Sequence, residues 1–528
     1  MQTRIRAFRL AGLTGLIGLA LLTFGACNDN KFLTEQPFDF VGPSNFYKTS
    51  GDALAAVNGA YAALENTSGT NYYGGLFVML VEFPTEMQTP YLSAGNERSQ
   101  VDNYTFTPSH NYIYQAWGNA YLAINRCNGV ISRVPGVPMD TVLRNRIVGE
   151  AKFLRALNYF NLVRLFGGVP IKTIETTSLD SLAKPRASAT DVYALIIQDL
   201  QDAIKVLPPT SSYGASDAGR ASRGAAKSLL AKVYIQRAGT GVGTSQDYQS
   251  ALTLLQNVDQ TEGYSLVANY SDLFDMKHKT NSEVIFDIQC INAPGLGCHL
   301  SSQDAPRNSN YGSSQNGSFT AELPFFNEYK TTDKRRAVTW QLSFVNKANQ
   351  VITWDATQTA KKPYGADAPY MHKFLDSLST GNDAANYIIQ RYADNLLLES
   401  EAINQLMGPT TAAYAPINAV RQRAGIGNLT PGLSQAAFND SVFHERRLEL
   451  TMEGPNGYFD TQRDWGYLTG RILADMQAGQ AAGFKTNQVP KANPFGSGPI
   501  PDKFRLMPIP QTAIDLNPML AGHQNPGW

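Results

Sequence analysis

The 528-residue sequence has no excess of charge of either sign, since 44 basic residues are balanced by 44 acidic residues. A protein without net positive charge has no long-range electrostatic attraction for DNA or RNA, so we expect no nucleic-acid partner. Histidine is scarce, with six residues, and none stands in a triad or a metal-ligand spacing. His444-Glu445 starts like a zinc-binding helix motif, but Leu448 occupies the place of the second histidine. We therefore expect neither a metal nor a cofactor.

Cysteine is also rare, with four residues. If Cys27 is modified, the remaining three are an odd number, which argues against a disulfide framework. Cys290 and Cys298 are close enough in sequence to close a short loop, while Cys127 has no such neighbour. No spacing among them suggests zinc.

Catalytic motifs are missing as well. The glycine-rich stretch 239–243 has no following lysine and no preceding strand, which predicts a connector between helices, and there is no Gly-x-Ser-x-Gly elbow. Glycoside hydrolysis needs two carboxyl groups held about 5 to 9.5 Å apart across a cleft. Asp460/Asp464 and Glu399/Glu401 are available in principle, but Arg463 between the first pair favours ordinary ion pairing on a helix surface. We expect no enzymatic activity.

The first 27 residues have the layout of a cleaved secretory signal. Three early arginines precede the uncharged run 10–26, and the small pair Gly25-Ala26 stands directly before Cys27. This ending resembles that of bacterial lipoproteins, in which the cysteine is acylated and becomes the mature N-terminus. The run is short for a membrane span, which needs roughly 20 apolar residues, so a single anchoring helix is the alternative.

Helical periodicity dominates the mature chain. The strongest predicted helix is 141–166. Gly167 and Pro170 follow it, and a glycine followed by a proline is typical of the C-terminal end of a helix. Small residues in 222–237 allow close approach of another helix, and helix pairs spaced near 34 residues resemble a degenerate tetratricopeptide solenoid. The predicted helices are 52–64, 112–133, 141–166, 190–207 (capped by Thr190), 222–237, 247–258, 386–407, 417–423 and 434–453.

The character of the chain changes between 262 and 385. Residues 283–289 predict a strand, and the remainder is rich in Asn, Ser, Gly and Pro, as in 306–312. Loops this long are usually functional. The proline-punctuated end, 499–528, is expected to pack across the body because Met507, Ile509, Ile514 and Leu516 need burial.

These observations predict a mainly α fold: tetratricopeptide-like helix pairs in an α-α superhelix, plus an irregular loop-rich half with a few short strands. The expected divisions are a lipoprotein signal peptide (1–26), a lipidated tether (27–43), a helical region (44–261), a loop-rich ligand-binding region (262–385), and C-terminal helices with an extended tail (386–528).

Several sequence blocks occur in order along almost the whole chain: 125–128, 149–156, 165–170, 221–226, 391–394, 417–421, 444–450, 506–510 and 525–528. In this order they resemble the SusD/RagB family of Bacteroidetes outer-membrane nutrient-binding lipoproteins. The resemblance implies a non-catalytic, lipid-anchored protein of the outer membrane, exposed at the cell surface. It would capture oligosaccharide and deliver it to a SusC-like TonB-dependent transporter, with the helix pairs facing the transporter and the loops carrying ligand.

The charged residues of these blocks are interpreted as structural. Carboxylates and guanidinium groups stand at helical i, i+3 or i, i+4 spacings, which predicts ion pairs rather than an active site. The residues are Glu150, Arg155, Glu445, Arg446, Arg447 and Glu449.

Sugar recognition needs flat aromatic rings and short polar side chains that bond hydroxyl groups. The loop-rich region offers both, and the resemblance adds the stretch 82–104. The candidate ligand-binding residues are Tyr91, Arg98, Asn308, Asn310, Tyr311, Trp340, Trp354, Tyr364 and Tyr370. For Trp340 and Trp354, which alternate with apolar neighbours, the alternative is the core of a small sheet.

Two other functions stay open at this point. One is a surface glycoside hydrolase, and the other is a transporter lid or scaffold that binds peptides or little ligand. The sequence names neither the sugar nor the linkage.

Overall fold

The computed structural model describes residues 46–65, 72–91, 96–178, 182–293, 296–312, 315–354, 368–379, 383–454, 456–481, 494–496 and 498–528. Residues 49–528 belong to one compact unit. The expected signal peptide and tether, with Cys27, lie outside the described residues, and so does the alternative of an anchoring helix at 10–26. Among the helices that are described, none combines the length and apolar character that a membrane crossing requires.

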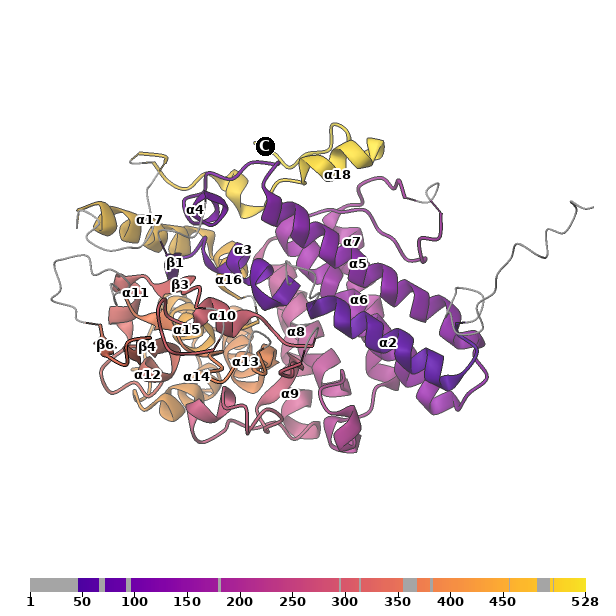
Figure 1. The fold of residues 1–528 in the computed structure, drawn as a ribbon, viewed down its shortest axis with the longest axis horizontal. Coiled ribbons are helices and arrows are strands. Elements are labelled where there is room, and N and C mark those ends of the chain that lie inside the picture. The colour runs from indigo at the N-terminus through magenta and orange to yellow at the C-terminus, as the bar shows by residue number, and fades with distance from the viewer. Residues whose placement is uncertain are drawn as a thin grey trace, which may run out of the picture. The chain divides into compact units, whose positions relative to one another are not determined.

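Helices that follow one another in sequence pack side by side in the first half of this unit, as Figure 1 shows for α2, α5, α6 and α7. This arrangement confirms the expected array of helix pairs. The helices are α2 (Ser50–Glu65), α3 (Phe77–Glu82), α4 (Asn96–Asp102), α5 (Asn111–Arg133), α6 (Thr141–Phe166), α7 (Ala189–Val206), α8 (Arg223–Gly239) and α9 (Gln246–Thr261).

The central helix α6 has the bounds that its sequence predicts. Asp140 caps it by accepting a hydrogen bond from the Leu143 amide at 2.8 Å, and Gly167 ends it with φ of 70°. From Gly149 onward nearly every residue is buried. A Cβ at Gly149 would lie 2.6 Å from a methyl carbon of Val206, so glycine lets α6 approach the end of α7 closely. Helix α7 begins earlier than predicted, because Ser188 and not Thr190 is its N-cap.

The C-terminal helices are α13 (Tyr392–Met407), α14 (Thr411–Ala424), α15 (Gln435–Leu450), α16 (Gly457–Arg463), α17 (Trp465–Ala481) and α18 (Gln511–Leu516). Three of them, α13, α14 and α15, share an apolar core with α8 and α9, while α18 packs on α5. The helix predicted from 386 starts only at Tyr392. The preceding residues form strand β8 (Tyr387–Arg391), because pairing with β2 (Val284–Ile288) satisfies their backbone and buries both faces. Helix α14 also starts earlier than predicted and continues through Pro416.

The loop-rich region contains short strands and short helices. A four-stranded antiparallel sheet has the order β1-β3-β7-β4, and β5 and β6 form a separate hairpin. The strands are β1 (Gln88–Pro90), β3 (Phe319–Ala321), β4 (Trp340–Gln341), β5 (Ser343–Val345), β6 (Val351–Thr353) and β7 (Tyr370–Met371). The short helices are α10 (Leu300–Asp304), α11 (Leu323–Glu328) and α12 (Arg336–Thr339). Single-turn helices are η1 (Tyr72–Leu76), η2 (Val134–Gly136), η4 (Thr210–Ser212), η5 (Ala215–Asp217), η6 (Tyr270–Leu273), η7 (Asp502–Arg505) and η8 (Pro518–Leu520).

The C-terminal tail crosses the body, as predicted. Met507 and Ile509 are fully buried, and the Met507 amide donates to the Leu165 carbonyl oxygen at 2.7 Å. The indole of Trp528 donates to two backbone carbonyl oxygens of the same tail and stacks on Phe106. The expected burial of Leu516 is wrong. This residue is 72% exposed because it ends α18, a short surface helix that the sequence analysis did not predict.

Candidate functional site

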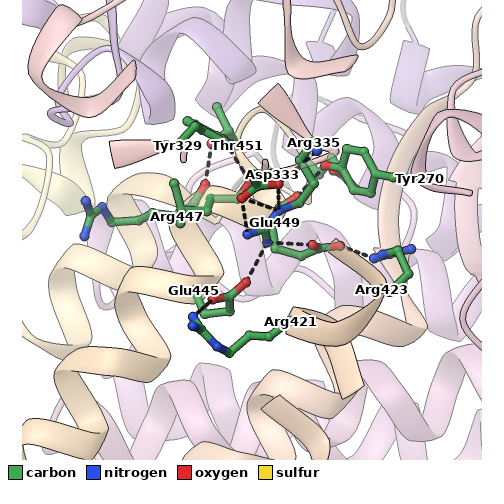
Figure 2. Close-up of polar contacts among 12 residues, drawn as sticks. Tyr270, Tyr329, Asp333, Arg335, Arg421, Arg423, Glu445, Arg447, Glu449 and Thr451 are labelled. Atoms are coloured by element: carbon green, nitrogen blue, oxygen red, sulfur yellow. Dashed lines mark hydrogen bonds and ion pairs between the residues drawn. The ribbon is translucent and has the colours of Figure 1, made fainter. Parts of the chain in front are cut away.

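A buried ion-pair network surrounds α15, and Figure 2 shows its centre. Glu449, which has no exposed surface, contacts Arg391 at 2.6 Å and Arg335 at 2.9 Å, and also pairs with Arg423. Five acids and five bases belong to the connected network: Glu283, Asp333, Glu445, Glu449, Glu453, Arg335, Lys373, Arg391, Arg421 and Arg423. These charges compensate one another, so the network stabilises the fold and offers no free acid or base.

The pairs confirm the structural interpretation of the charged blocks, but the predicted spacing within one helix is wrong for most of them. Arg155 on α6 reaches Asp199 on α7 at 2.8 Å, and Glu449 pairs with arginines on other elements. Arg146–Glu150 is an i, i+4 pair of the expected kind. Ion pairs between elements satisfy groups that are buried on both sides, which pairs along one exposed helix face do not need to do.

The sheet β1-β3-β7-β4 contains or adjoins three of the nine predicted ligand-binding residues. Tyr91 follows β1, and its amide donates to the Ser318 carbonyl oxygen at 3.4 Å, directly before β3. Strand β7 contains Tyr370 and strand β4 contains Trp340. The loop 306–312 is attached next to this sheet by the β5–β6 hairpin, since the Asn310 amide donates to the Val345 carbonyl oxygen at 2.8 Å.

Tyr311 is half-buried at the end of that loop and is held at both ends. Its hydroxyl oxygen accepts a hydrogen bond from Gln341 Nε2 at 2.6 Å, and its carbonyl oxygen accepts one from Gln315 Nε2 at 2.5 Å. Gly312 follows with φ of 22°, and a Cβ there would lie 1.9 Å from the Ser379 carbonyl oxygen. The loop is therefore ordered by specific contacts. Asn310, which precedes Tyr311 in this loop, is exposed.

Two arginines lie at the Tyr91 end of the same surface. Arg98 Nη1 donates to Ser318 Oγ at 2.6 Å, and its Nε donates to the Tyr112 hydroxyl at 3.3 Å. Arg307 stacks on the Tyr91 ring, with Cζ 4.6 Å from the ring centre, while its Nε donates to the Asn316 carbonyl oxygen at 2.9 Å. Both arginines are partly exposed. Tyr91 itself is buried, with 9% of its surface exposed, so its ring lies beneath Arg307. We call Arg98, Arg307, Asn310 and Tyr311, which are exposed or partly exposed, the loop surface.

Other predicted residues lie beneath the loop surface or beside it. Trp340 and Tyr370 are buried, packing on Phe325 and Phe344, and they support the sheet, which for Trp340 corresponds to the core alternative. Trp354 is half-buried and packs edge-on against Phe326. Asn308 adopts a positive φ of 62°, and its carbonyl oxygen accepts from the Lys347 amide, so it shapes the loop. Tyr364 lies outside the described residues.

Arg307 and Gln341 are the contributors that sequence reasoning missed. Arg307 stands inside the polar stretch 306–312 that the sequence analysis singled out, and arginine is both a hydrogen-bond donor and an aromatic-stacking group. Gln341 directly follows a candidate tryptophan. No sequence signal links Gln341 to Tyr311, since the contact spans 30 residues.

The carboxylate pairs considered for hydrolysis are engaged elsewhere. Asp460 is buried and pairs with Arg446 and Arg463, both at 2.8 Å, so its predicted place on a helix surface is wrong. Glu401 is also buried and pairs with Arg463 at 2.9 Å. Burial, assisted by the neighbouring carboxyl of Asp259, raises the pKa of Glu399 to about 7.

Two family models match the chain. The model described as the SusD family matches residues 229–528, and the model described as "Starch-binding associating with outer membrane" matches residues 56–235. A curated relative, SusD-like protein P25 of Formosa agariphila, is 28% identical over 549 residues, which cover 96% of this chain and 97% of the relative.

Solved structures show the same fold. A SusD homologue from Bacteroides thetaiotaomicron superposes with a TM-score of 0.79 at 23% identity, covering 92% of this chain and 98% of that chain. A laminarin-binding SusD-like protein superposes with a TM-score of 0.70 at 25% identity, covering 91% of this chain and all of that chain (100%). The fold thus defines a mainly α-helical protein with tetratricopeptide-like helix pairs. The chain belongs to the SusD family, which confirms the resemblance found in the sequence.

Proposed function

We propose that this protein is a non-catalytic oligosaccharide-binding lipoprotein of the outer membrane. The observation that carries this proposal is the loop surface, where the Tyr311 ring, the Asn310 side-chain amide and two guanidinium groups are partly exposed on a SusD-family fold. The matched family model described as starch-binding and outer-membrane associating supports it, as does the structural relative described as laminarin-binding.

The loop surface has the chemistry that a sugar requires. Tyr311 offers an aromatic ring for the C–H face of a pyranose. The side-chain amide of the exposed residue Asn310 can donate hydrogen bonds to hydroxyl groups and accept hydrogen bonds from them. Arg98 and Arg307 supply further donors. Because hydrogen bonds already hold Tyr311 and both arginines, a ligand would bind with little loss of side-chain entropy.

The absence of catalysis is part of the same proposal. The buried carboxylates Asp460 and Glu401 pair with Arg446 and Arg463, which are not residues of the loop surface. A glycosidase needs one protonated and one ionised carboxyl group across a substrate cleft. Incubation of the purified full chain with starch or laminarin should therefore release no new reducing ends.

Ligand binding is tested by affinity electrophoresis of the purified full chain in gels containing starch, laminarin, xylan or alginate, followed by calorimetry. We expect retardation by at least one glycan and a loss of about tenfold or more in affinity for Tyr311→Ala. The exchange Tyr213→Ala, at a half-buried tyrosine before α8, is the matched control and should leave binding unchanged. Equal loss with both variants, or no retardation by any glycan, would contradict the proposal.

We further propose that acylated Cys27 anchors the protein to the outer membrane, where it passes ligand to a SusC-like TonB-dependent transporter. The anchoring and delivery rest on the lipoprotein-like signal and on family membership. Isolation of membranes should recover the protein together with a large barrel protein, and Cys27→Ser should release it into the soluble fraction. Recovery of unlipidated wild-type chain from the cytosol would overturn this part.

A further inference from the structure

A pocket of about 320 Å³ lies apart from the loop surface, between the C-terminal half of α2, the segment 216–220 and strand β2. Its walls are largely apolar and include Tyr61, Leu64 and Phe286. Ile291 and Leu296, each 52% exposed, form part of the rim. None of the loop-surface residues lines this pocket. Its volume is at the lower end of the range for small-molecule sites, roughly 300 to 1,000 Å³.

Glu65, the last residue of α2, lines this pocket and is only 7% exposed. Its Oε1 is buried with no hydrogen-bond partner among the described residues. A buried carboxylate in that position is costly unless a cation or a donor compensates it. Burial accordingly raises the pKa of Glu65 to about 7.

The groups around Glu65 do not supply that compensation. Arg220 lines the same pocket, but its guanidinium is bonded to Glu150 at 2.9 Å, Asp217 at 2.7 Å and Asn58 at 2.9 Å. Asp287 is a second acid in the pocket; it accepts from Asn386 at 2.8 Å, and burial raises its pKa to about 6. The other carboxylate oxygen of Asp287 accepts from Gln289, so the pocket presents the Glu65 carboxylate among apolar walls.

A metal ion does not fit this donor set. One carboxylate oxygen of Glu65 and the sulfur atoms of Cys290 and Cys298 lie within 4.8 Å of one another. The two sulfurs are bonded to each other in a disulfide, which leaves Glu65 as the single ionisable ligand of the three. The disulfide instead closes the short loop that carries Ile291 and Leu296 to the rim.

We propose that this pocket binds a small organic cation, a primary ammonium group on a compact apolar body, with Glu65 as its counter-ion. The ammonium would donate to the Glu65 carboxylate, and the apolar body would lie against Tyr61, Phe286 and the aliphatic rim. This site is separate from the oligosaccharide site in residues and in ligand charge.

The test uses the purified full chain at pH 8, where Glu65 is ionised, and three probes of one shape: cyclohexylammonium, cyclohexanol and cyclohexanecarboxylate. Ligand-observed NMR titration should show cyclohexylammonium binding at least about tenfold more tightly than either of the others. Glu65→Gln, which keeps shape and removes charge, should weaken cyclohexylammonium by about tenfold or more. Ala218→Trp, at the exposed side of the pocket, should block it by filling the space.

Tyr311→Ala distinguishes this proposal from the proposed function, since it should leave cyclohexylammonium binding unchanged. Circular dichroism checks that each variant is folded, and Glu65→Gln should be folded because it mimics the neutral acid. The proposal is overturned if cyclohexylammonium shows no binding up to about 10 mM, if cyclohexanol binds equally well, or if a folded Glu65→Gln retains full affinity.

Discussion

Replacing Glu449 by glutamine tests how far the buried network holds the loop-rich region 262–385 to the C-terminal helices. Glu449 on α15 contacts arginines from β8, from α14 and from the segment before α12. The exchange keeps the size of the side chain and removes one negative charge. Since five acids balance five bases in the wild-type network, the variant carries one uncompensated buried positive charge.

The expected cost follows from that imbalance. Breaking a buried ion pair by removing one partner typically costs about 3–5 kcal/mol, because the other charge stays buried and unpaired. The three arginines hold the pKa of Glu449 well below its ordinary value despite burial, which places the cost at the upper end of this range. Since the folded pKa is depressed, the stabilisation is present above the unfolded pKa of about 4.3 and is lost at lower pH.

Urea unfolding followed by tryptophan fluorescence at pH 7 measures the effect. Asp202→Asn is the matched control: Lys152 and Lys205 also depress the pKa of Asp202, but its side chain is 27% exposed and the Lys205 side chain 67% exposed. An exposed pair contributes about 0.2–1 kcal/mol, so Asp202→Asn should shift the midpoint little. Similar shifts for the two variants, or a Glu449→Gln deficit that persists unchanged at pH 3, would refute the reasoning.

Three further predictions concern single sites. The folded-state pKa of Glu65, about 7, lies above the unfolded value, so the contribution of Glu65 to stability should fall as pH rises from about 4 to 7. Glu65→Gln should remove this loss. Its free energy of unfolding, measured by thermal unfolding, should be larger than that of wild type by about 1–3 kcal/mol at pH 8 and equal to it at pH 4. Cys290→Ala with Cys298→Ala opens a loop of eight residues' separation and should cost about 2–3 kcal/mol in urea unfolding, an effect that reductant reproduces in wild type and not in the variant. Gly312→Ala should reduce glycan affinity in calorimetry although Tyr311 is intact, because the added methyl collides with the Ser379 backbone; Gly241→Ala, where no atom lies within 4 Å of the added carbon, is the control for positive φ alone.

Long helices could be predicted from the sequence because their signals are local. The apolar period of 141–166, its acidic cap and its terminal glycine coincide with the observed α6. The sequence does not distinguish strand β8 from the start of a helix, because its partner, β2, lies about 100 residues earlier and five residues are too few to show a distinctive period. Pairing over that distance is a tertiary property.

The charged blocks show the same limit. Their structural role could be predicted, since carboxylates and arginines alternate within them. Their partners could not, because Glu445 pairs with Arg335, 110 residues away, and not with a residue of its own helix. The spacing within α15 sets the face on which a charge lies, while packing decides which element meets that face.

The aromatic candidates divide in a similar way. Tyr311, in a run of polar residues, is partly exposed as expected, whereas Trp340 and Tyr370 lie in strands whose both faces are covered. Alternation of apolar residues around Trp340 predicted this alternative. Arg307 belongs to the loop surface because it stacks on Tyr91. This contact joins segments more than 200 residues apart, so no local sequence pattern predicts it.

The most direct measurement of the central claim is calorimetry of Tyr311→Ala and Tyr213→Ala, side by side with wild type, against the glycan that retards the protein in gels. If the loop surface receives the sugar, only the first exchange weakens binding, by about tenfold or more. Wild-type affinity in Tyr311→Ala would contradict the account.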